Sequence, residues 1–217
     1  MEPGDRLIGP AAAPGLARLA DPGWQFIEAP SLEAFTAEDW ALMQRQRAVF
    51  AASHQAEAVL AMLRAGADEP SFGYRINNFQ HCLQSATRVL QAGLDEETVA
   101  VALLHDIGFT ACPATHGDFA AALLQPYISP RNHWMLEHHQ IFQDVHCPTH
   151  PGVDPDARER FRGHAHFAWT AEYVARFDQD AIDPHEKVLP LEAFVPLVRR
   201  LFARPPQARA NAQWRTE

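Results

Sequence analysis

The chain has 217 residues, of which 47% are hydrophobic, and this size and content predict one compact domain with a short appendage. Its formal net charge of −9 argues against nucleic acid as a partner, because phosphate backbones bind basic surfaces. No apolar run approaches the roughly 20 residues that a membrane span needs. The N-terminus does not resemble a secretory signal, and the three cysteines show no CxxC spacing, so we expect a cytoplasmic protein.

The N-terminal third contains one strong helical pattern. The first 23 residues are rich in Pro, Gly and Ala, and we expect them to form a flexible arm. Residues 24–70 are expected to form a helical extension packed on the core. Within it, apolar spacing predicts a long helix from Trp40 to Arg64, which begins after a weak capping box formed by Thr36 and Asp39.

The expected core covers residues 71–204 and is followed by a tail, residues 205–217. Asp95 and Ser129 are predicted to begin two of its helices, and residues 143–157 are expected to form a long proline-rich loop. Alternating β-branched runs are few, so the fold class is expected to be all-α, a helical bundle. Its helices are predicted over residues 76–93, 95–106, 116–124, 130–142, 156–178 and 189–202.

Histidine and aspartate residues recur on these predicted helices. In the segment from Val101 to Gly108, apolar residues lead into His105 and Asp106, as at a buried helix end that carries two metal-type ligands. Imidazole and carboxylate together suit iron, manganese and zinc, and a helical bundle can direct such side chains inward. For any one residue, a hydrogen-bonded core histidine or a surface acid is an equal alternative. The complete series favours a metal site built from His81, His105, Asp106, His116, His138 or His139, and Asp178.

This series resembles the H…HD…D pattern of the HD-domain superfamily of helical metalloenzymes. The finer likeness is to its oxygenase branch, which includes myo-inositol oxygenase and the HD-domain oxygenases that cleave hydroxylated organophosphonates. The resemblance covers about residues 72–204. The segments that carry it are Asn77–Thr87, Ala102–Gly108, His116–Ala121, His138–Gln143 and Phe177–Gln179.

The resemblance implies a non-haem centre of two iron ions, mixed-valent Fe(II)/Fe(III), with O2 as co-substrate. Asp106 would bridge the irons. One iron would take His81, His105 and Asp178, and the other would take His116 and His139. His139 is preferred to His138 because Gln143, one helical turn later, stands where relatives place a polar residue that faces the substrate.

The implied reaction is oxidative cleavage of the C–P bond of a small 1-hydroxy-organophosphonate to phosphate and a carboxylic acid. Relatives that act on a primary ammonium have a glutamate seven residues before the first histidine ligand, where this chain has Tyr74. A trimethylammonium group has no N–H donor and is better held by aromatic faces such as those of Tyr74, Phe72 and Phe79. The expected substrate is therefore 1-hydroxy-2-(trimethylammonio)ethylphosphonate. Two alternatives for Tyr74 stay open, namely covering the iron before substrate arrives and packing as part of a loop.

The phosphonate end requires cations or amide donors, and the sequence does not rank the candidates. They are Arg131, His133, Arg158, Arg162 and Arg176. The same ligands would also serve a metal-dependent HD-domain phosphohydrolase, in which the metals activate water against a phosphoester or nucleotide. A third alternative is a degenerate HD domain that acts as a binding module. The oligomeric state stays open.

Overall fold

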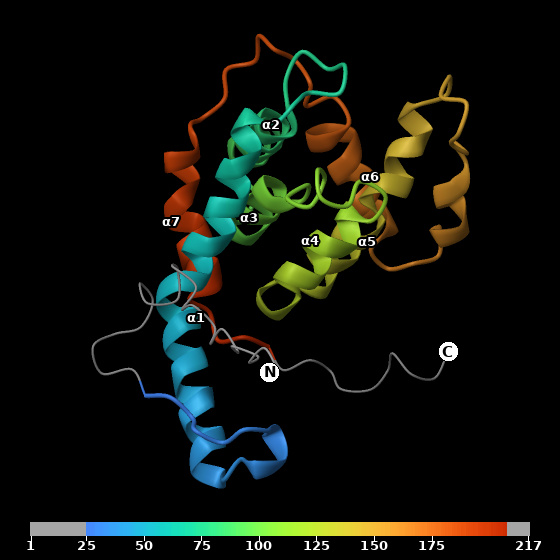
Figure 1. The fold of residues 1–217 in the computed structure, drawn as a ribbon. Coiled ribbons are helices and arrows are strands. Elements are labelled where there is room, and N and C mark those ends of the chain that lie inside the picture. Colours follow the sequence, from blue (N-terminus) through green and yellow to red (C-terminus); the bar gives the residue numbers. More distant parts are fainter. Residues whose placement is uncertain (1–24, 208–217) are drawn as a thin grey trace, which may run out of the picture. The chain divides into compact units, whose positions relative to one another are not determined.

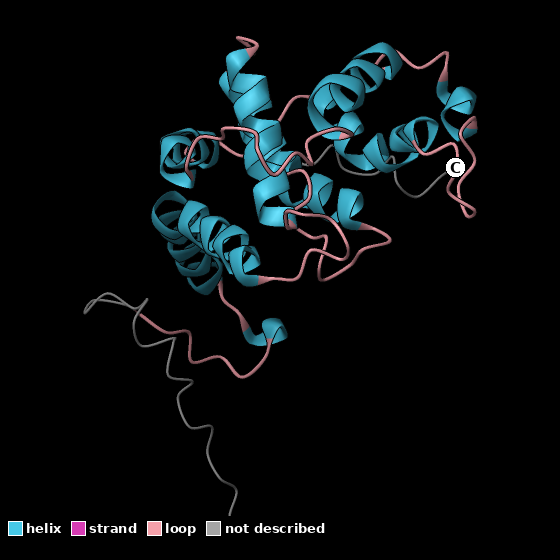
Figure 2. Ribbon diagram, turned by 90° about the horizontal axis from the view of Figure 1, so that it is seen from above, coloured by secondary structure: helices cyan, strands magenta, loops and turns pink. Residues whose placement is uncertain are grey.

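The computed structural model describes residues 25–207, and every regular element in that range is a helix, which confirms the expected all-α fold (Figures 1 and 2). The chain divides into two compact units, residues 1–49 and residues 50–217. The expected arm, residues 1–23, and most of the expected tail lie outside the described residues. Of the tail, Gln207 is described, and its backbone N–H donates to the carbonyl of Pro126 at 2.7 Å.

Helix α1 covers Ala37–Ala65 and therefore crosses the division between the two units. It begins at the expected capping box, in which Asp39 N–H donates to Thr36 Oγ1 at 3.2 Å and Thr36 N–H donates to Asp39 Oδ2 at 2.9 Å. The division at residues 49 and 50 differs from the expected boundary near residue 70. The second half of α1 belongs to the larger unit because it contributes Val59, Leu60 and Leu63 to that unit's buried core.

The following helices agree with the sequence pattern to within a few residues. Asp95 and Ser129 cap their helices as expected, since their side chains accept backbone N–H groups of Thr98 and Asn132. Asn77 forms a further capping box with Gln80. The helices are α2 (Asn78–Gln91), α3 (Glu96–Leu104), α4 (His116–Leu124), α5 (Pro130–Gln143) and α7 (Leu191–Phe202).

Helix α3 is central to the larger unit. Every residue from Thr98 to Leu104 is buried, as expected of a helix that is apolar around its whole circumference. It packs against α2 and α7, whereas α4 packs against α5 (Figure 1). The C-terminal end of α3 therefore lies inside the larger unit, and the residues that follow it lie where several helices meet.

The prediction of one helix over residues 156–178 is wrong. The segment forms a 3₁₀ helix, η6 (Ala157–Phe161), then the short α6 (Phe167–Tyr173) and a π-helical turn, η7 (Val174–Asp178). Between η6 and α6, His164 stacks on the ring of Trp134 in α5, with 4.3 Å between ring centroids and 12° between planes. This packing against a distant helix and the poor helix propensity of the preceding Gly163 both favour a turn here.

Candidate metal centre

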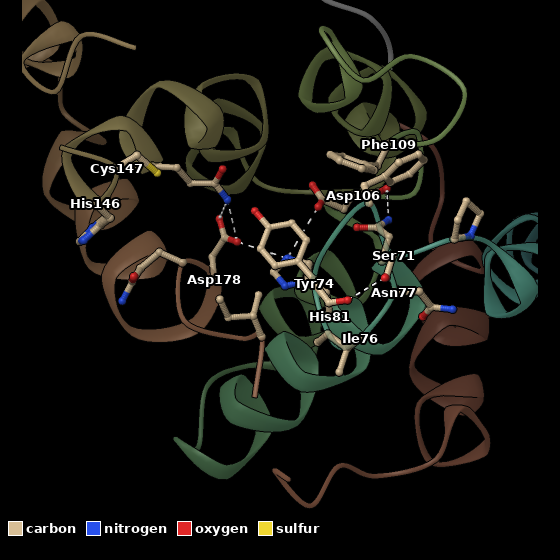
Figure 3. Close-up of a pocket in the computed structure, with 16 residues that line it drawn as sticks. Ser71, Tyr74, Ile76, Asn77, His81, Asp106, Phe109, His146, Cys147 and Asp178 are labelled. Atoms are coloured by element: carbon tan, nitrogen blue, oxygen red, sulfur yellow. Dashed lines mark hydrogen bonds and ion pairs between the residues drawn. The ribbon is translucent and has the colours of Figure 1, made fainter. Parts of the chain in front are cut away.

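Six histidine and aspartate side chains from five segments meet in the interior of the larger unit, and Figure 3 shows three of them, His81, Asp106 and Asp178. Five of them are buried, and His81 is partly buried. His81 lies on α2, His105 and Asp106 follow α3, His116 begins α4, His139 lies on α5, and Asp178 ends η7. The structure thus brings together all six residues that the sequence assigned to a metal site.

All four imidazoles are oriented in the same way. In each, Nδ1 lies within hydrogen-bonding distance of a backbone carbonyl, which can only accept, so Nδ1 carries the hydrogen and Nε2 is directed to the centre. Such anchoring is the usual arrangement of histidines that bind metal through Nε2. The bonds join His81 to Ala181 O (3.0 Å), His105 to Ala102 O (2.8 Å), His116 to Pro113 O (2.8 Å) and His139 to Leu136 O (2.8 Å).

The shortest distances divide the ligand atoms into two groups that share Asp106, and the groups adjoin, since the ligand atoms of His105, His139 and Asp178 also lie within 4.8 Å of one another. In the first, His81 Nε2 and His105 Nε2 are 3.0 Å apart, and Asp178 Oδ1 lies 3.3 Å and 3.5 Å from them. In the second, His116 Nε2 and His139 Nε2 are 3.0 Å apart, and Asp106 Oδ1 lies 3.0 Å and 3.2 Å from them. The other oxygen, Asp106 Oδ2, is 3.6 Å from His81 Nε2, which allows one carboxylate to serve both groups.

The centre stabilises positive charge between these atoms. Burial by itself opposes ionisation of Asp178, but hydrogen bonds from His105 and His81 outweigh it and hold the pKa of that carboxyl below its usual range. Burial likewise opposes a charged His105, yet Asp106 and Asp178 raise its pKa to about 9. Two Nε2 atoms 3.0 Å apart need a proton or a cation between them, since both Nδ1 atoms already carry hydrogens. Metal ions can take the place of those protons, so the donor set fits a metal centre.

A cavity of about 370 Å³ reaches only one of the two groups. His81, Asp106 and Asp178 line it, whereas His105, His116 and His139 do not. We call His81, His105 and Asp178 the open group, and His116 and His139 the closed group. Figure 3 shows the three cavity-lining ligands pointing toward one another, with Tyr74 in the same opening. A small molecule in this cavity would meet a metal bound by the open group.

Aromatic side chains surround the mouth of the cavity. Phe72 and Tyr74 line it and remain 66% and 57% exposed, and the ring of Phe72 lies 6.2 Å from that of Phe109. Phe72 has a φ of 48°, a conformation that costs an L-residue about 1–2 kcal/mol and that occurs preferentially at functional sites. Phe79, the third aromatic candidate, packs against the hydrophobic core and does not line the cavity.

The arginines expected to bind the anion lie elsewhere, and none of the four belongs to the described cavity wall. Arg131 pairs with Asp95 at 3.4 Å and covers the ring of Trp169. Arg162 and Arg176 pair with glutamates on their own segments, and Arg158 lies 5.9 Å above the ring of Phe142. His133, the remaining candidate, pairs with Glu137. Their placement does not support the substrate role expected for them.

The two adjacent histidines of α5 have different environments. His139 is fully buried and faces Asp106, whereas His138 stacks on Trp134 with 4.1 Å between ring centroids. His138 Nδ1 is bonded to the carbonyl of Trp134 at 2.9 Å. The geometry therefore places His139, and not His138, in the cluster, as the helical spacing to Gln143 suggested.

Sequence reasoning missed most of the polar wall of the cavity. Asn78 donates to the backbone carbonyl of Asp106 at 2.9 Å, and the amide and imidazole groups of Gln179 and His146 also line the cavity. His146 and its neighbour Cys147 follow α5 in a region whose sequence carries no periodic signal. Asn78 could have been found from its place next to the helix cap, one turn before His81.

Fold and site together define an all-α protein in which a buried cluster of histidine and aspartate could hold metal at the base of an open cavity. A scan against protein-family models and a search of curated proteins found no match to this chain. Among the described residues, no helix is both long enough and apolar enough to cross a membrane.

Proposed function

We propose that this protein is a non-haem di-iron oxygenase that cleaves the C–P bond of a 1-hydroxy-organophosphonate. The proposed substrate is 1-hydroxy-2-(trimethylammonio)ethylphosphonate, which with one O2 would give glycine betaine and phosphate. The observation that carries the proposal is a six-ligand cluster in which one carboxylate, Asp106, is shared and one group alone opens to an aromatic-rimmed cavity.

The ligand types support iron, for which histidine and carboxylate are suitable donors. When bound, the two irons would supply the site at which O2 reacts and would relay to it electrons that come from the substrate. The chain itself would hold one metal through His116, His139 and Asp106 in a closed environment. It would hold the other through His81, His105 and Asp178 and leave its remaining side exposed to the cavity.

The cavity wall supports a zwitterionic substrate. Tyr74 and Phe72 would present ring faces to the trimethylammonium group, an attraction of about 0.5–2 kcal/mol for each well-placed ring. The hydroxyl and phosphonate oxygens would lie toward the metal held by the open group. His146 and Gln179 offer further hydrogen-bond donors along the same wall.

The same ligands would serve a phosphohydrolase, and the residues that line the cavity bear on the choice between the two proposals. A phosphoester or nucleotide carries concentrated negative charge that proteins usually meet with arginine or lysine in addition to metals. Among the described residues that line this cavity, there is no arginine or lysine. The aromatic rim favours a substrate that carries its own positive charge, and the metal of the open group would have to balance the charge of the phosphonate.

Metal content, electron paramagnetic resonance and oxygen uptake test the proposal together. Protein purified without oxygen should contain two irons per chain and give a mixed-valent signal that changes when the hydroxyphosphonate is added. One O2 should be consumed for each phosphate released. Phosphate release without oxygen uptake would establish a hydrolase, and a chain that binds no metal would act as a binding module.

A further inference from the structure

Gln143, the last residue of α5, holds one ligand of the open group. Its side-chain amide nitrogen Nε2 lies 2.9 Å from each of the two carboxylate oxygens of Asp178. Asp178 is fully buried, and its Oδ1 also faces His81 and His105. The carboxylate is therefore fixed from two sides, with the imidazoles on one side and the amide on the other.

The backbone around Asp178 explains why this side chain needs a contact that orients it. Asp178 ends a π-helical turn, in which Gln179 N–H donates to Val174 O across five residues at 3.0 Å. π-turns are frequent at functional sites, where the additional residue changes the direction of a side chain. Because α5 and η7 are separate segments, the bond from Gln143 fixes the plane of the Asp178 carboxylate relative to the other ligands.

The amide can orient Asp178 and still border the substrate cavity. With two contacts of 2.9 Å, Nε2 is committed to the carboxylate, whereas Oε1 has no hydrogen bond within the described chain. Gln143 lines the cavity together with Asp178, so its oxygen is available as an acceptor on that wall. The expected role of Gln143 as a polar group that only faces the substrate accounts for the oxygen and leaves the nitrogen contacts unexplained.

We propose that Gln143 is a positioning residue that keeps Asp178 oriented with Oδ1 toward the His81–His105 pair. By engaging both oxygens, it opposes rotation of the carboxylate into a form that would bind a metal through both oxygens and close the side facing the cavity. The proposal rests on the metal-binding part of the proposed function and is independent of the oxygen chemistry. Partners that orient metal ligands typically contribute 10- to 100-fold to metal affinity.

The test compares zinc affinities of the two groups in full-length variants by competition with a chromophoric chelator. Gln143→Leu keeps the approximate size and removes the amide, and Gln143→Asn keeps an amide that is one methylene too short. The control is Gln140→Leu, because Gln140 lies on the same helix and bonds to Pro113 O at 3.3 Å without contacting Asp178. A His116→Ala background identifies the binding step that belongs to the open group.

Both Gln143 variants should lose 10- to 100-fold in zinc affinity at the open group and less than about twofold at the closed group. Gln140→Leu should leave the open group within about twofold of wild type. Equal zinc affinities in wild type and Gln143→Leu would overturn this inference and leave the proposed function standing. A parallel loss of affinity at both groups, together with a lower unfolding temperature of the metal-free protein, would have the same meaning. If the wild-type chain binds neither zinc nor iron, both this inference and the proposed function are wrong.

Discussion

The open and closed groups contain the same kinds of ligand but are held in place by different interactions. His116 and His139 lie on α4 and α5, two helices that pack directly against each other and exclude the cavity. In the open group, Asp178 is fixed by Gln143, and Nδ1 of His81 is bonded to the carbonyl of Ala181. The closed group is therefore placed mainly by the packing of α4 on α5. Two ligands of the open group depend in addition on distant contacts, Asp178 on the side chain of Gln143 in α5 and His81 on the segment that follows η7.

This difference separates the tasks of the two metal positions. A group enclosed by helices holds its metal with little room for exchange of ligands, whereas a group on a cavity wall can accept a small molecule. Substitutions should divide in the same way. Changes in the closed half should act through packing and stability, and changes in the open half should act through ligand orientation and substrate preference. Substitution of Asp106, which both halves share, should affect metal binding in both groups.

The largest effect is expected from Asp106→Ala, which removes the carboxylate that contacts both groups. Neither group keeps a complete set of ligands, so the purified variant should contain almost no metal. Elemental analysis per chain measures this directly. The free energy of unfolding should also become insensitive to added chelator, because the wild type loses its metal-derived stability and the variant has none to lose. Two metals per chain in this variant would show that Asp106 is not the bridge.

His116→Ala should remove one metal and keep the other. It takes one imidazole from the closed group and leaves His81, His105 and Asp178 unchanged. We expect one metal equivalent per chain, measured by elemental analysis after gel filtration. Loss of both metals would indicate that the two groups bind cooperatively, and the division into an open and a closed half would then be incorrect.

Gly117→Ala should perturb the closed half through packing. A Cβ at this position would lie 2.5 Å from the backbone oxygen of Leu136 and 3.1 Å from Cε1 of His139, so α4 and α5 must move apart. We expect the free energy of unfolding to fall by about 1–3 kcal/mol. Gly163→Ala is the control, because a Cβ there meets open space, and its effect should stay within about 0.5 kcal/mol. Denaturant unfolding measures the free energy of unfolding of both variants. Equal values for Gly117→Ala and Gly163→Ala would contradict the packing argument.

Tyr74→Glu should change the preference of the open half for its substrate. A primary ammonium leaves N–H donors without an acceptor in an aromatic-lined site, at a cost of about 1–3 kcal/mol, or roughly ten- to hundredfold in kcat/KM. The new carboxylate should accept those hydrogen bonds and narrow the preference for the trimethylated substrate by that factor. Oxygen uptake with both hydroxyphosphonates gives the ratio. Phe79→Leu, outside the cavity, should leave it unchanged, and an unchanged ratio in Tyr74→Glu would remove Tyr74 from substrate selection.

The smallest effect is expected from His138→Ala. This side chain stacks on Trp134 and lies outside both groups, so the variant should keep two metals per chain. Loss of its ring contacts with Trp134 and Phe161 should lower the free energy of unfolding by about 0.5–1.5 kcal/mol. His139→Ala, the adjacent change, should empty the closed group. If the two variants exchange these phenotypes, the orientation of α5 is incorrect by one residue.

Several features could be predicted from the sequence because their causes are local. The bounds of α4 and the caps at Asp95 and Ser129 follow from side-chain type and helical spacing. The six converging side chains followed from the order of imidazoles and carboxylates together with the burial of the helices that carry them. The preference for His139 over His138 came from the resemblance, since relatives place a polar residue that faces the substrate at the position of Gln143.

Other features depend on contacts between distant segments and left no local signal. The π-turn that ends at Asp178 arises within a segment whose pattern favours an ordinary helix. The break near His164 combines such a distant contact, the stacking on Trp134, with the local signal of Gly163. The surface arginines were chosen for their charge, but charge alone does not indicate which of them face a cavity. Arg131, for example, is held by Asp95 and the ring of Trp169.

The bond between His81 and the carbonyl of Ala181 also has a consequence for the order in which the chain matures. The other three imidazoles take their orientation from carbonyls three residues earlier, whereas His81 depends on a residue that is synthesised long after it. Arg88, bonded to Glu186 at 2.6 Å, and Gln84, bonded to the carbonyl of Asp183 at 2.5 Å, attach that same late segment to α2. On the ribosome, the closed group can therefore assemble while the open group still lacks both Asp178 and the partner of His81. A metal bound by the open group would enter after the segment around residues 178–186 has docked on α2, because that segment supplies Asp178 and the partner of His81.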